Sequence, residues 1–146
     1  MGDEGDLLEL VACGREAVLA TIRRDGRPQL SNILYTWDPG ERIARISTTA
    51  KRAKTRNLMR DPRATLYVPG DHFWAFAVAD CDGEICGPTK TAGDEAGQEL
   101  LKVHSSFYGA LEPDAFFKEM VENERLLIRL RVSHLYGLVM DRPPGA

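Results

Sequence analysis

A cluster of positive charges follows a run of small hydroxyl-bearing residues near the middle of the chain. Six of the thirteen residues from Lys51 to Arg63 are basic and one is acidic, and Ser47, Thr48 and Thr49 stand just before them. Guanidinium groups fork onto phosphate or carboxylate oxygens, an ammonium acts as a point charge, and hydroxyls can donate to an anion. These residues are therefore the candidates for holding a phosphate.

The pattern around the cluster predicts a strand that ends at the hydroxyl residues and a helix over 51–60, which the Asp61-Pro62 pair would stop. Such a junction offers free backbone N–H groups and the positive end of a helix dipole, to which Arg52 and Lys54 would add full charges. The stretch lacks the glycine spacing of a P-loop or a dinucleotide fingerprint. A solvated helix face remains the alternative explanation, because runs of charge are usually solvated.

Composition points to one globular domain over residues 1–146, with loose ends at 1–5 and 140–146. The chain is 43% hydrophobic and carries a formal net charge of -3, so no long-range field would recruit nucleic acid or an anionic membrane. No aromatic residue stands between Lys51 and Arg63 to stack on bases. No apolar run approaches the ~20 residues of a membrane span, and the acidic N-terminus does not resemble a signal peptide. We expect a cytoplasmic protein that binds neither nucleic acid nor membrane.

Hydrophobic patterning predicts a β-rich α+β domain of about six antiparallel strands with a few helices. Asp25-Gly26 marks a hairpin, and Asp38-Pro39-Gly40 marks a second turn. Residues 125–139 alternate as a final strand, while 6–14, 94–109 and a segment that opens at Pro113 have helical character. Strands joined by tight hairpins suggest a barrel, because closure removes open sheet edges.

Other residues capable of chemistry have simpler explanations. The cysteines are odd in number and show no metal-ligand pattern, so we expect free thiols and no metal site: Cys13, Cys81 and Cys86. Acidic residues alternate with two of them and could imitate a metal cluster, but a solvated turn is the better interpretation: Asp80, Asp82 and Glu84. His104 precedes two serines, yet the chain has no GxSxG nucleophile elbow.

Four stretches occur together in the order found in one known family: RRDGRPQLSNILY, RISTTAKRAKTRNLMRDPRA, WAFAVADCDGEI and VSHLYG. From about Leu7 to Gly137 the chain resembles the flavin/deazaflavin oxidoreductase family, which has the split β-barrel of pyridoxamine 5'-phosphate oxidase. The resemblance is closest to the actinobacterial branch that uses the deazaflavin coenzyme F420, through KRAKTRNL after a Ser-containing strand and GRPQLSN upstream. Many members carry a proline just before the Arg-Ala-Lys segment, where this chain has Ala50-Lys51. The lysine adds a cation.

The resemblance implies a homodimer whose two sites are each built from both subunits. It places the cofactor phosphate at Ser47, Arg52 and Lys54, with Thr48 and Asn57 as helpers. It places the deazaflavin ring along one strand, and it assigns closure of the pocket to aromatic and histidine residues of the partner. The ring would lie along Gln29, Leu30, Ser31 and Asn32, the partner would contribute Trp74, Phe76, His134 and Tyr136, and the oligoglutamate tail would meet Lys51 and Arg56.

Several of these residues also have structural interpretations. Gln29 and Asn32 could satisfy a strand edge, Trp74 and Phe76 could be core residues, and His134 with Tyr136 could be a structural pair. The function implied is hydride transfer between F420 and an unsaturated small-molecule substrate, with no catalytic side chain assigned. The alternatives are an FMN-dependent oxidase or reductase, a non-catalytic F420-binding protein, and an anion- or RNA-binding barrel.

Overall fold

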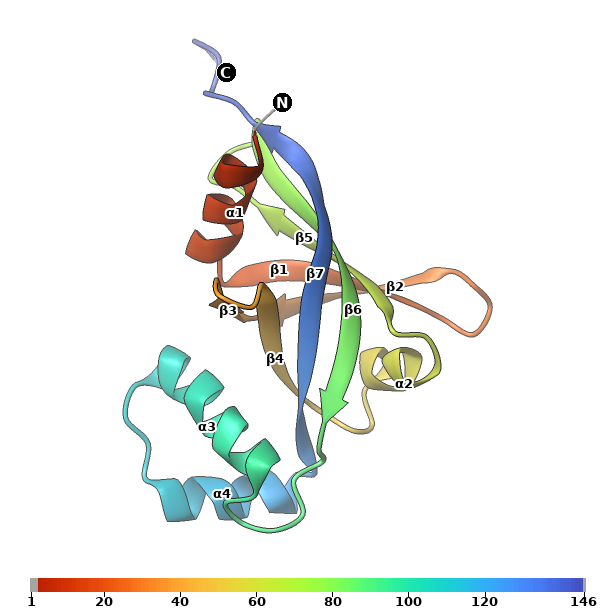
Figure 1. The fold of residues 1–146 in the computed structure, drawn as a ribbon, viewed down its shortest axis with the longest axis vertical. Helices are drawn as coiled ribbons and strands as arrows, with labels where there is room; N and C mark the ends of the chain where they lie inside the picture. Colours follow the sequence, from red (N-terminus) through yellow and green to blue (C-terminus); the bar gives the residue numbers. More distant parts are fainter. Residues whose placement is uncertain (1–2, 146) are drawn as a thin grey trace.

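One curled antiparallel sheet forms the body of the molecule, and helices lie against its sides and lower end (Figure 1). The computed structural model describes residues 3–145, in which seven strands follow the order β2-β1-β5-β6-β7-β4-β3. The elements are α1 (Glu4–Cys13), β1 (Glu16–Ile22), β2 (Pro28–Leu34), β3 (Thr36–Asp38), β4 (Ile43–Thr49), α2 (Ala53–Arg60), β5 (Arg63–Pro69), β6 (Ala75–Cys86), α3 (Glu95–Tyr108), α4 (Pro113–Glu122) and β7 (Arg125–Val139).

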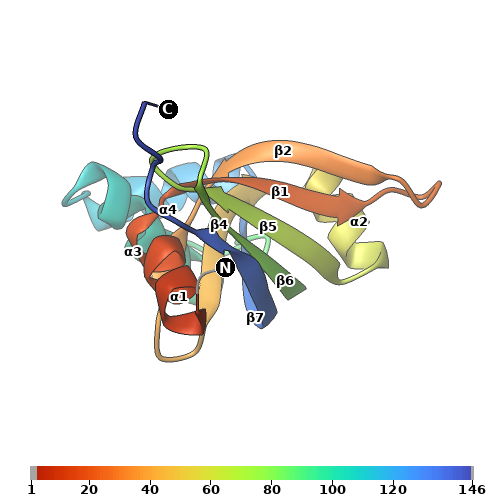
Figure 2. The same ribbon diagram turned by 90° about the horizontal axis from the view of Figure 1, so that it is seen from above.

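The curl of the sheet brings together strands that are far apart in its order. β2 and β4 are five places apart, yet they contact one another. Seen from above, β1 and β2 lie over one side of the fold while β5, β6 and β7 turn away beneath them (Figure 2). This is the split-barrel α+β architecture expected from the sequence.

Two hydrophobic clusters stabilise this arrangement. The larger lies inside the curled sheet, and α1 closes it by burying Leu7 and Val11. The Tyr35 hydroxyl donates to the Val11 carbonyl at 2.5 Å and so ties α1 to the segment after β2. The smaller cluster joins α3 and α4 to the sheet around Leu127. The α3–α4 hairpin therefore packs around a hydrophobic cluster of its own and contacts the sheet at β4 and β7.

Local sequence signals explain most element boundaries. Asp25 accepts a hydrogen bond from the Arg27 amide in the β1–β2 hairpin, where Gly26 has a φ of 87°. Asp94 caps α3 by accepting from the Gly97 amide, and Glu112 does the same for α4. The final strand occupies the predicted residues 125–139.

The elements differ from the prediction in three respects. The strand count is seven rather than six, because the buried Tyr35 separates β2 from β3 and β3 pairs with β4. The basic helix begins at Ala53, two residues later than predicted. Glu4 and Gly5 are helical rather than loose, whereas 140–145 form neither helix nor strand. Residues 1–2 and 146, also expected to be loose, lie outside the described residues.

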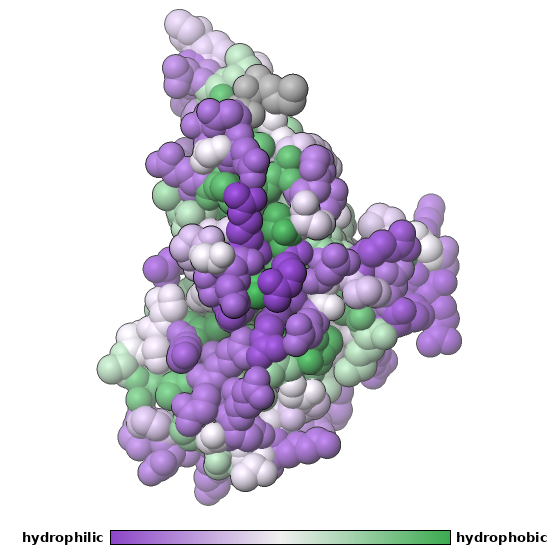
Figure 3. All heavy atoms as spheres, viewed as in Figure 1, coloured by the Kyte–Doolittle hydropathy of each residue, from purple (hydrophilic) through white to green (hydrophobic). Residues whose placement is uncertain are grey.

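None of the helices within residues 3–145 is long and apolar enough to cross a membrane. Hydrophilic side chains gather over the middle of β7 and β4, between α1 and α3 (Figure 3).

Candidate anion-binding site

A cavity of about 190 Å³ lies between the edge of β2, the end of β4, α2, α3 and the start of β7. Its apolar wall includes Ile33, Ile46 and Val103. Its polar lining comes from five elements that are remote in sequence: Asn32, Ser47, Lys54, His104, Tyr108 and Arg125. Cations, a hydroxyl and an imidazole thus converge on a space large enough for a phosphate group.

Ser47 lies at the centre of this arrangement. β4 pairs with β7 so that Thr49 is opposite Arg125 and Ser47 is opposite Leu127. Arg125 therefore lies diagonally across from Ser47, and its Nη2 donates to the Ser47 Oγ at 2.6 Å. The pairing register of two strands, 78 residues apart in the chain, creates this contact.

Lys54 is placed by the junction between β4 and α2. The Thr55 hydroxyl donates to the Thr49 carbonyl at 2.8 Å, which fixes the first turn of α2 against the strand end. Arg52 is the N-cap residue of α2 and makes no side-chain cap hydrogen bond. Lys54 is then half-buried and lines the cavity.

His104 enters the cavity from α3. Its Nε2 lies 2.8 Å from the Ser47 Oγ. The imidazole packs edge-on against Phe116 of α4, with ring centroids 5.0 Å apart. The helix itself is held by its buried Leu100 and Val103.

The cations of this site repel one another, and none of them forms an ion pair with a carboxylate among residues 3–145. Burial, and then the neighbouring Arg52 and Arg125, lower the pKa of Lys54. Burial, and then Arg52, likewise lower the pKa of Arg125, and burial followed by Arg125 lowers that of His104. Within residues 3–145, no carboxylate lies within 4.0 Å of the charged nitrogens of Arg52, Lys54 or Arg125.

One atom of the cluster is left without a hydrogen bond. The Arg125 Nε is buried and unpartnered among the described residues. A buried polar donor without an acceptor costs free energy, and so does a partly desolvated cation without an anion. A bound anion would relieve both costs, so this constellation is built to accept negative charge.

The residues predicted to hold the phosphate do not all line the cavity. Ser47 and Lys54 line the cavity. Arg52 is exposed beside it and close enough to influence both Lys54 and Arg125. The proposed helpers lie elsewhere. Thr48 is buried in β4, and the Asn57 amide donates to the Thr21 hydroxyl at 3.1 Å, which joins α2 to β1.

The two residues expected at the cofactor tail are both exposed near the start of α2. The Lys51 Nζ lies 3.9 Å from the Glu124 carboxylate, and 82% of its side chain is exposed. Arg56 projects from α2 into solvent. We call these two exposed cations, neither of which lines the cavity, the basic rim.

The four predicted ring-lining residues of β2 point in alternate directions. Leu30 and Asn32 are exposed on one face of the strand. Gln29 and Ser31 point to the opposite face, where their pairing partners Thr21 and Leu19 are buried. The Ser31 Oγ is buried and has no hydrogen-bond partner among the described residues.

Within residues 3–145, none of the four residues expected from the partner lines this cavity. Phe76 stacks on Tyr67 at 5.6 Å, His134 and Tyr136 lie 5.9 Å apart on β7, and Trp74 precedes β6. β6 and β7 are three and four places from β2 in the strand order.

Tyr67 and Tyr136 lie on a row of paired residues that crosses five strands and in which Val78 is buried. Successive pairings place Asn32, Val18, Tyr67, Val78 and Tyr136 side by side on one face of the sheet. Tyr67 is 41% exposed and Tyr136 is 48% exposed, and Leu30 on the same face is 61% exposed. We call this row, with Leu30 and Phe76, the exposed sheet face.

Sequence reasoning missed Arg125, His104 and Tyr108 as members of the site. In the sequence, His104 stands beside two serines that form no hydrolase motif, and Arg125 stands at the start of a predicted strand. The one available signal was a cation at the beginning of an alternating strand. The partner of that strand, which decides where Arg125 points, is not written in the local sequence.

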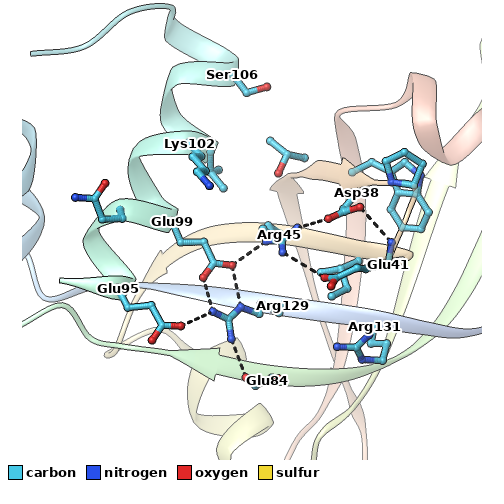
Figure 4. Close-up of a pocket in the computed structure, with 16 residues that line it drawn as sticks. Asp38, Glu41, Arg45, Glu84, Glu95, Glu99, Lys102, Ser106, Arg129 and Arg131 are labelled. Atoms are coloured by element: carbon cyan, nitrogen blue, oxygen red, sulfur yellow. Dashed lines mark hydrogen bonds and ion pairs between the residues drawn. The ribbon is translucent and has the colours of Figure 1, made fainter. Parts of the chain in front are cut away.

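A larger cavity, about 830 Å³, lies on the other side of α3 and contains a network of ion pairs (Figure 4). Glu99 of α3 accepts from the Nε atoms of Arg45 and Arg129, both at 2.8 Å. These contacts, that of Arg129 first, lower the pKa of Glu99 to about 2. The other carboxylates of the network each contact one of the two arginines: Asp38, Glu41, Glu84 and Glu95.

This network holds α3 against the sheet. Cys86, Glu95 and Glu99 are close enough to share a metal ion, but the Arg129 guanidinium contacts all three. Each carboxylate of the network is thus paired with a guanidinium, and the network fixes the helix that carries His104. The thiols are free, as expected, and burial raises the pKa of Cys81 to about 12.

Comparison with known proteins gives one family and a set of similar folds. The profile of the family described as pyridoxamine 5'-phosphate oxidase matches residues 6–138. An F420 reductase is 27% identical, with a TM-score of 0.67, over 93% of this chain and 98% of that chain. A conserved hypothetical protein from Mycobacterium tuberculosis is 23% identical, with a TM-score of 0.69, over 100% of this chain and 94% of that one. A FAD-binding protein from Mesorhizobium loti is 17% identical, with a TM-score of 0.62, over 93% and 94%.

Proposed function

The chain belongs to the pyridoxamine 5'-phosphate oxidase family, and from that premise we propose that it is an F420-dependent oxidoreductase. It would transfer a hydride between the deazaflavin and an unsaturated small molecule. The observation that carries the proposal is the uncompensated cationic cavity around Ser47, Lys54 and Arg125. The similarity to an F420 reductase over nearly the whole chain supports the choice of F420.

The cavity fits the phosphate of such a cofactor. The Ser47 hydroxyl, the Lys54 ammonium and the Arg125 guanidinium would hold it, and the orphan Arg125 Nε would gain an acceptor. A volume of about 190 Å³ is below the range of roughly 300–1,000 Å³ that encloses a drug-sized ligand. The ring system would therefore lie outside the cavity, along the exposed Leu30 and Asn32 of β2.

We further propose that the protein is a homodimer that uses the exposed sheet face. Contiguous exposed apolar residues on a folded chain commonly mark an interaction surface. Within residues 3–145, none of the residues assigned to closing the pocket lines the cavity, so we assign them to a second copy. Phe76, His134 and Tyr136 of that copy, with Trp74, would cover the ring.

When bound, F420 supplies a hydride at a carbon position rather than one-electron or oxygen chemistry. The chain would contribute position and environment. Ser47, Lys54 and Arg125 would anchor one end of the cofactor, so that the ring is held against β2 in a fixed orientation. Orientation and exclusion of water from a reacting pair are large contributors to rate.

The basic rim would favour the anionic tail of F420. Lys51 and Arg56 are exposed just before and within α2, the helix that carries Lys54, and attraction between exposed charges is weak and screened by salt. The rim should therefore affect affinity modestly and mainly at low ionic strength.

The direct test of turnover is oxidation of reduced F420 by purified protein with a panel of compounds that carry activated C=C, C=N or C=O groups. Oxidation that depends on both protein and substrate is expected. It should be weakened by Lys54→Ala but not by Arg24→Ala, a matched control in the exposed β1–β2 hairpin. Binding without turnover across the panel would favour a non-catalytic F420-binding protein, and turnover only with reduced FMN would assign the chain to the flavin-dependent members.

A further inference from the structure

We propose that His104 is a pH-dependent positioning residue of the anion site: when neutral it accepts the Ser47 hydroxyl hydrogen, and when protonated it donates to Ser47, adds a positive charge beside the cavity and frees that hydrogen for a bound anion. The inference rests on the proposed function in taking the cavity as an anion site. It adds a residue from α3, a helix that none of the expected phosphate residues belongs to.

The hydrogen bonds around Ser47 define the resting state. The Arg125 Nη2 donates to the Ser47 Oγ at 2.6 Å, so the single hydroxyl hydrogen is free to point to the His104 Nε2 at 2.8 Å. This arrangement requires Nε2 to be an acceptor, which is the case in the neutral imidazole that carries its proton on Nδ1. In the absence of an anion, the Ser47 hydrogen is thus directed to His104 and away from the cavity.

Protonation of His104 reverses this hydrogen bond. The neutral imidazole takes a proton from solvent at Nε2, becomes an imidazolium and is then a donor at that atom. The Ser47 oxygen can then accept from both His104 and Arg125, and its own hydrogen is released to donate to an anion in the cavity. One proton thus adds a charge to the site and redirects a hydroxyl donor.

The groups that face His104 determine when this happens. Arg125 of β7 acts on the ring, and Lys54 of α2 lines the same cavity. Glu119 of α4 acts in the opposite direction, and Tyr108 of α3 lies beside the ring. In the free protein, burial and then Arg125 lower the pKa of His104, which favours the neutral imidazole.

An anion in the cavity would offset the cations and raise the pKa of His104. The bound state then carries more protons than the free state, so affinity must increase as the pH falls through the interval between the two pKa values. Uptake of one proton limits the steepest change to about tenfold in Kd per pH unit. A site that used only the arginines and Lys54 would show almost no change between pH 5.5 and 7.5.

Sulfate is the appropriate probe, because its own charge is constant over this interval. Calorimetric titration of the full-length protein with sulfate from pH 5.5 to 8.5 should show affinity that rises as the pH falls. His104→Gln should remove most of the pH dependence. His72→Gln, which changes a histidine between β5 and β6, is the matched control and should retain it.

A second measurement does not depend on a variant. The imidazole signals of the wild-type protein, titrated by NMR with and without sulfate, should show a higher pKa for His104 in the presence of the anion. An unchanged pKa, or pH dependence that persists in His104→Gln, overturns the role of His104. Absence of sulfate binding at every pH would instead overturn the anion site and, with it, the proposed function.

Discussion

Replacing Lys54 by methionine should have opposite effects on ligand binding and on the stability of the ligand-free protein. Lys54 is half-buried in α2, and Arg52 and Arg125 both act against its charge. Methionine keeps an unbranched stem and has a similar helix propensity. The substitution therefore removes the ammonium with little change in packing.

The magnitudes follow from this environment. Loss of a charge-assisted hydrogen bond to phosphate costs about 1.5–3 kcal/mol, which is about 10- to 150-fold in Kd. Relief of like-charge repulsion is worth about 0.5 kcal/mol or less, so the ligand-free melting temperature should be unchanged or rise by about 1–2 °C.

The assay pairs a fluorescence titration with F420 and a thermal melt of the ligand-free protein. Lys118→Met, on the exposed side of α4, is the matched control and should change neither affinity nor melting temperature. Unchanged F420 affinity in Lys54→Met would refute the phosphate assignment. A fall in both affinity and melting temperature would refute the interpretation of Lys54 as an uncompensated cation.

Three further substitutions test the frame around the site. Glu99→Gln should lower the melting temperature at pH 7, because the folded-state pKa of Glu99, about 2, lies below the usual 4.5. The ionised Glu99 therefore stabilises the fold above pH 4.5, and this stabilisation is lost as the pH falls towards 2. The melting temperatures of the two proteins should converge there. Gly137→Ala should cost about 2–4 kcal/mol in urea unfolding, since a Cβ at that φ of 150° would collide with the Phe76 carbonyl; Gly40→Ala, where the space is ordinary, should be nearly neutral. Tyr67→Asp should convert the protein to a monomer in sedimentation and weaken F420 binding, whereas a dimer that persists would exclude the exposed sheet face as the interface.

Local signals in the sequence predicted much of the fold. The alternation of residues 125–139, the turn at Asp25-Gly26 and the strand-to-helix junction after Ser47 all depend on neighbours along the chain. The seventh strand was missed because β3 has three residues, too few for a periodic pattern to show. The family was recognisable because its motifs lie on consecutive elements in a fixed order.

The site was less predictable because it is made by pairing between remote segments. Ser47 and Lys54 are separated by seven positions and were found together. Arg125 joins them only through the register of β4 against β7, and His104 only through the docking of α3. Asn57 shows the reverse case, since its position suggested a phosphate helper while its amide joins α2 to β1.

The exposed sheet face illustrates a further limit. Tyr67 and Phe76 are in separate strands, and their stacking appears only once β5 and β6 pair. The occupant of such a face depends on a second molecule, and the sequence of one chain specifies only the chemistry of the face.

The measurement that tests the central claim most directly is a pair of titrations of the purified protein, one with F420 and one with FMN, at the same pH and ionic strength. The cationic cavity predicts saturable binding of a phosphate-bearing cofactor, and the basic rim predicts that F420 binds more tightly than FMN, by up to about 1 kcal/mol or about fivefold at low ionic strength. Tighter binding of FMN would contradict the deazaflavin assignment. If neither cofactor bound, the cations around Ser47 would not form a cofactor phosphate site.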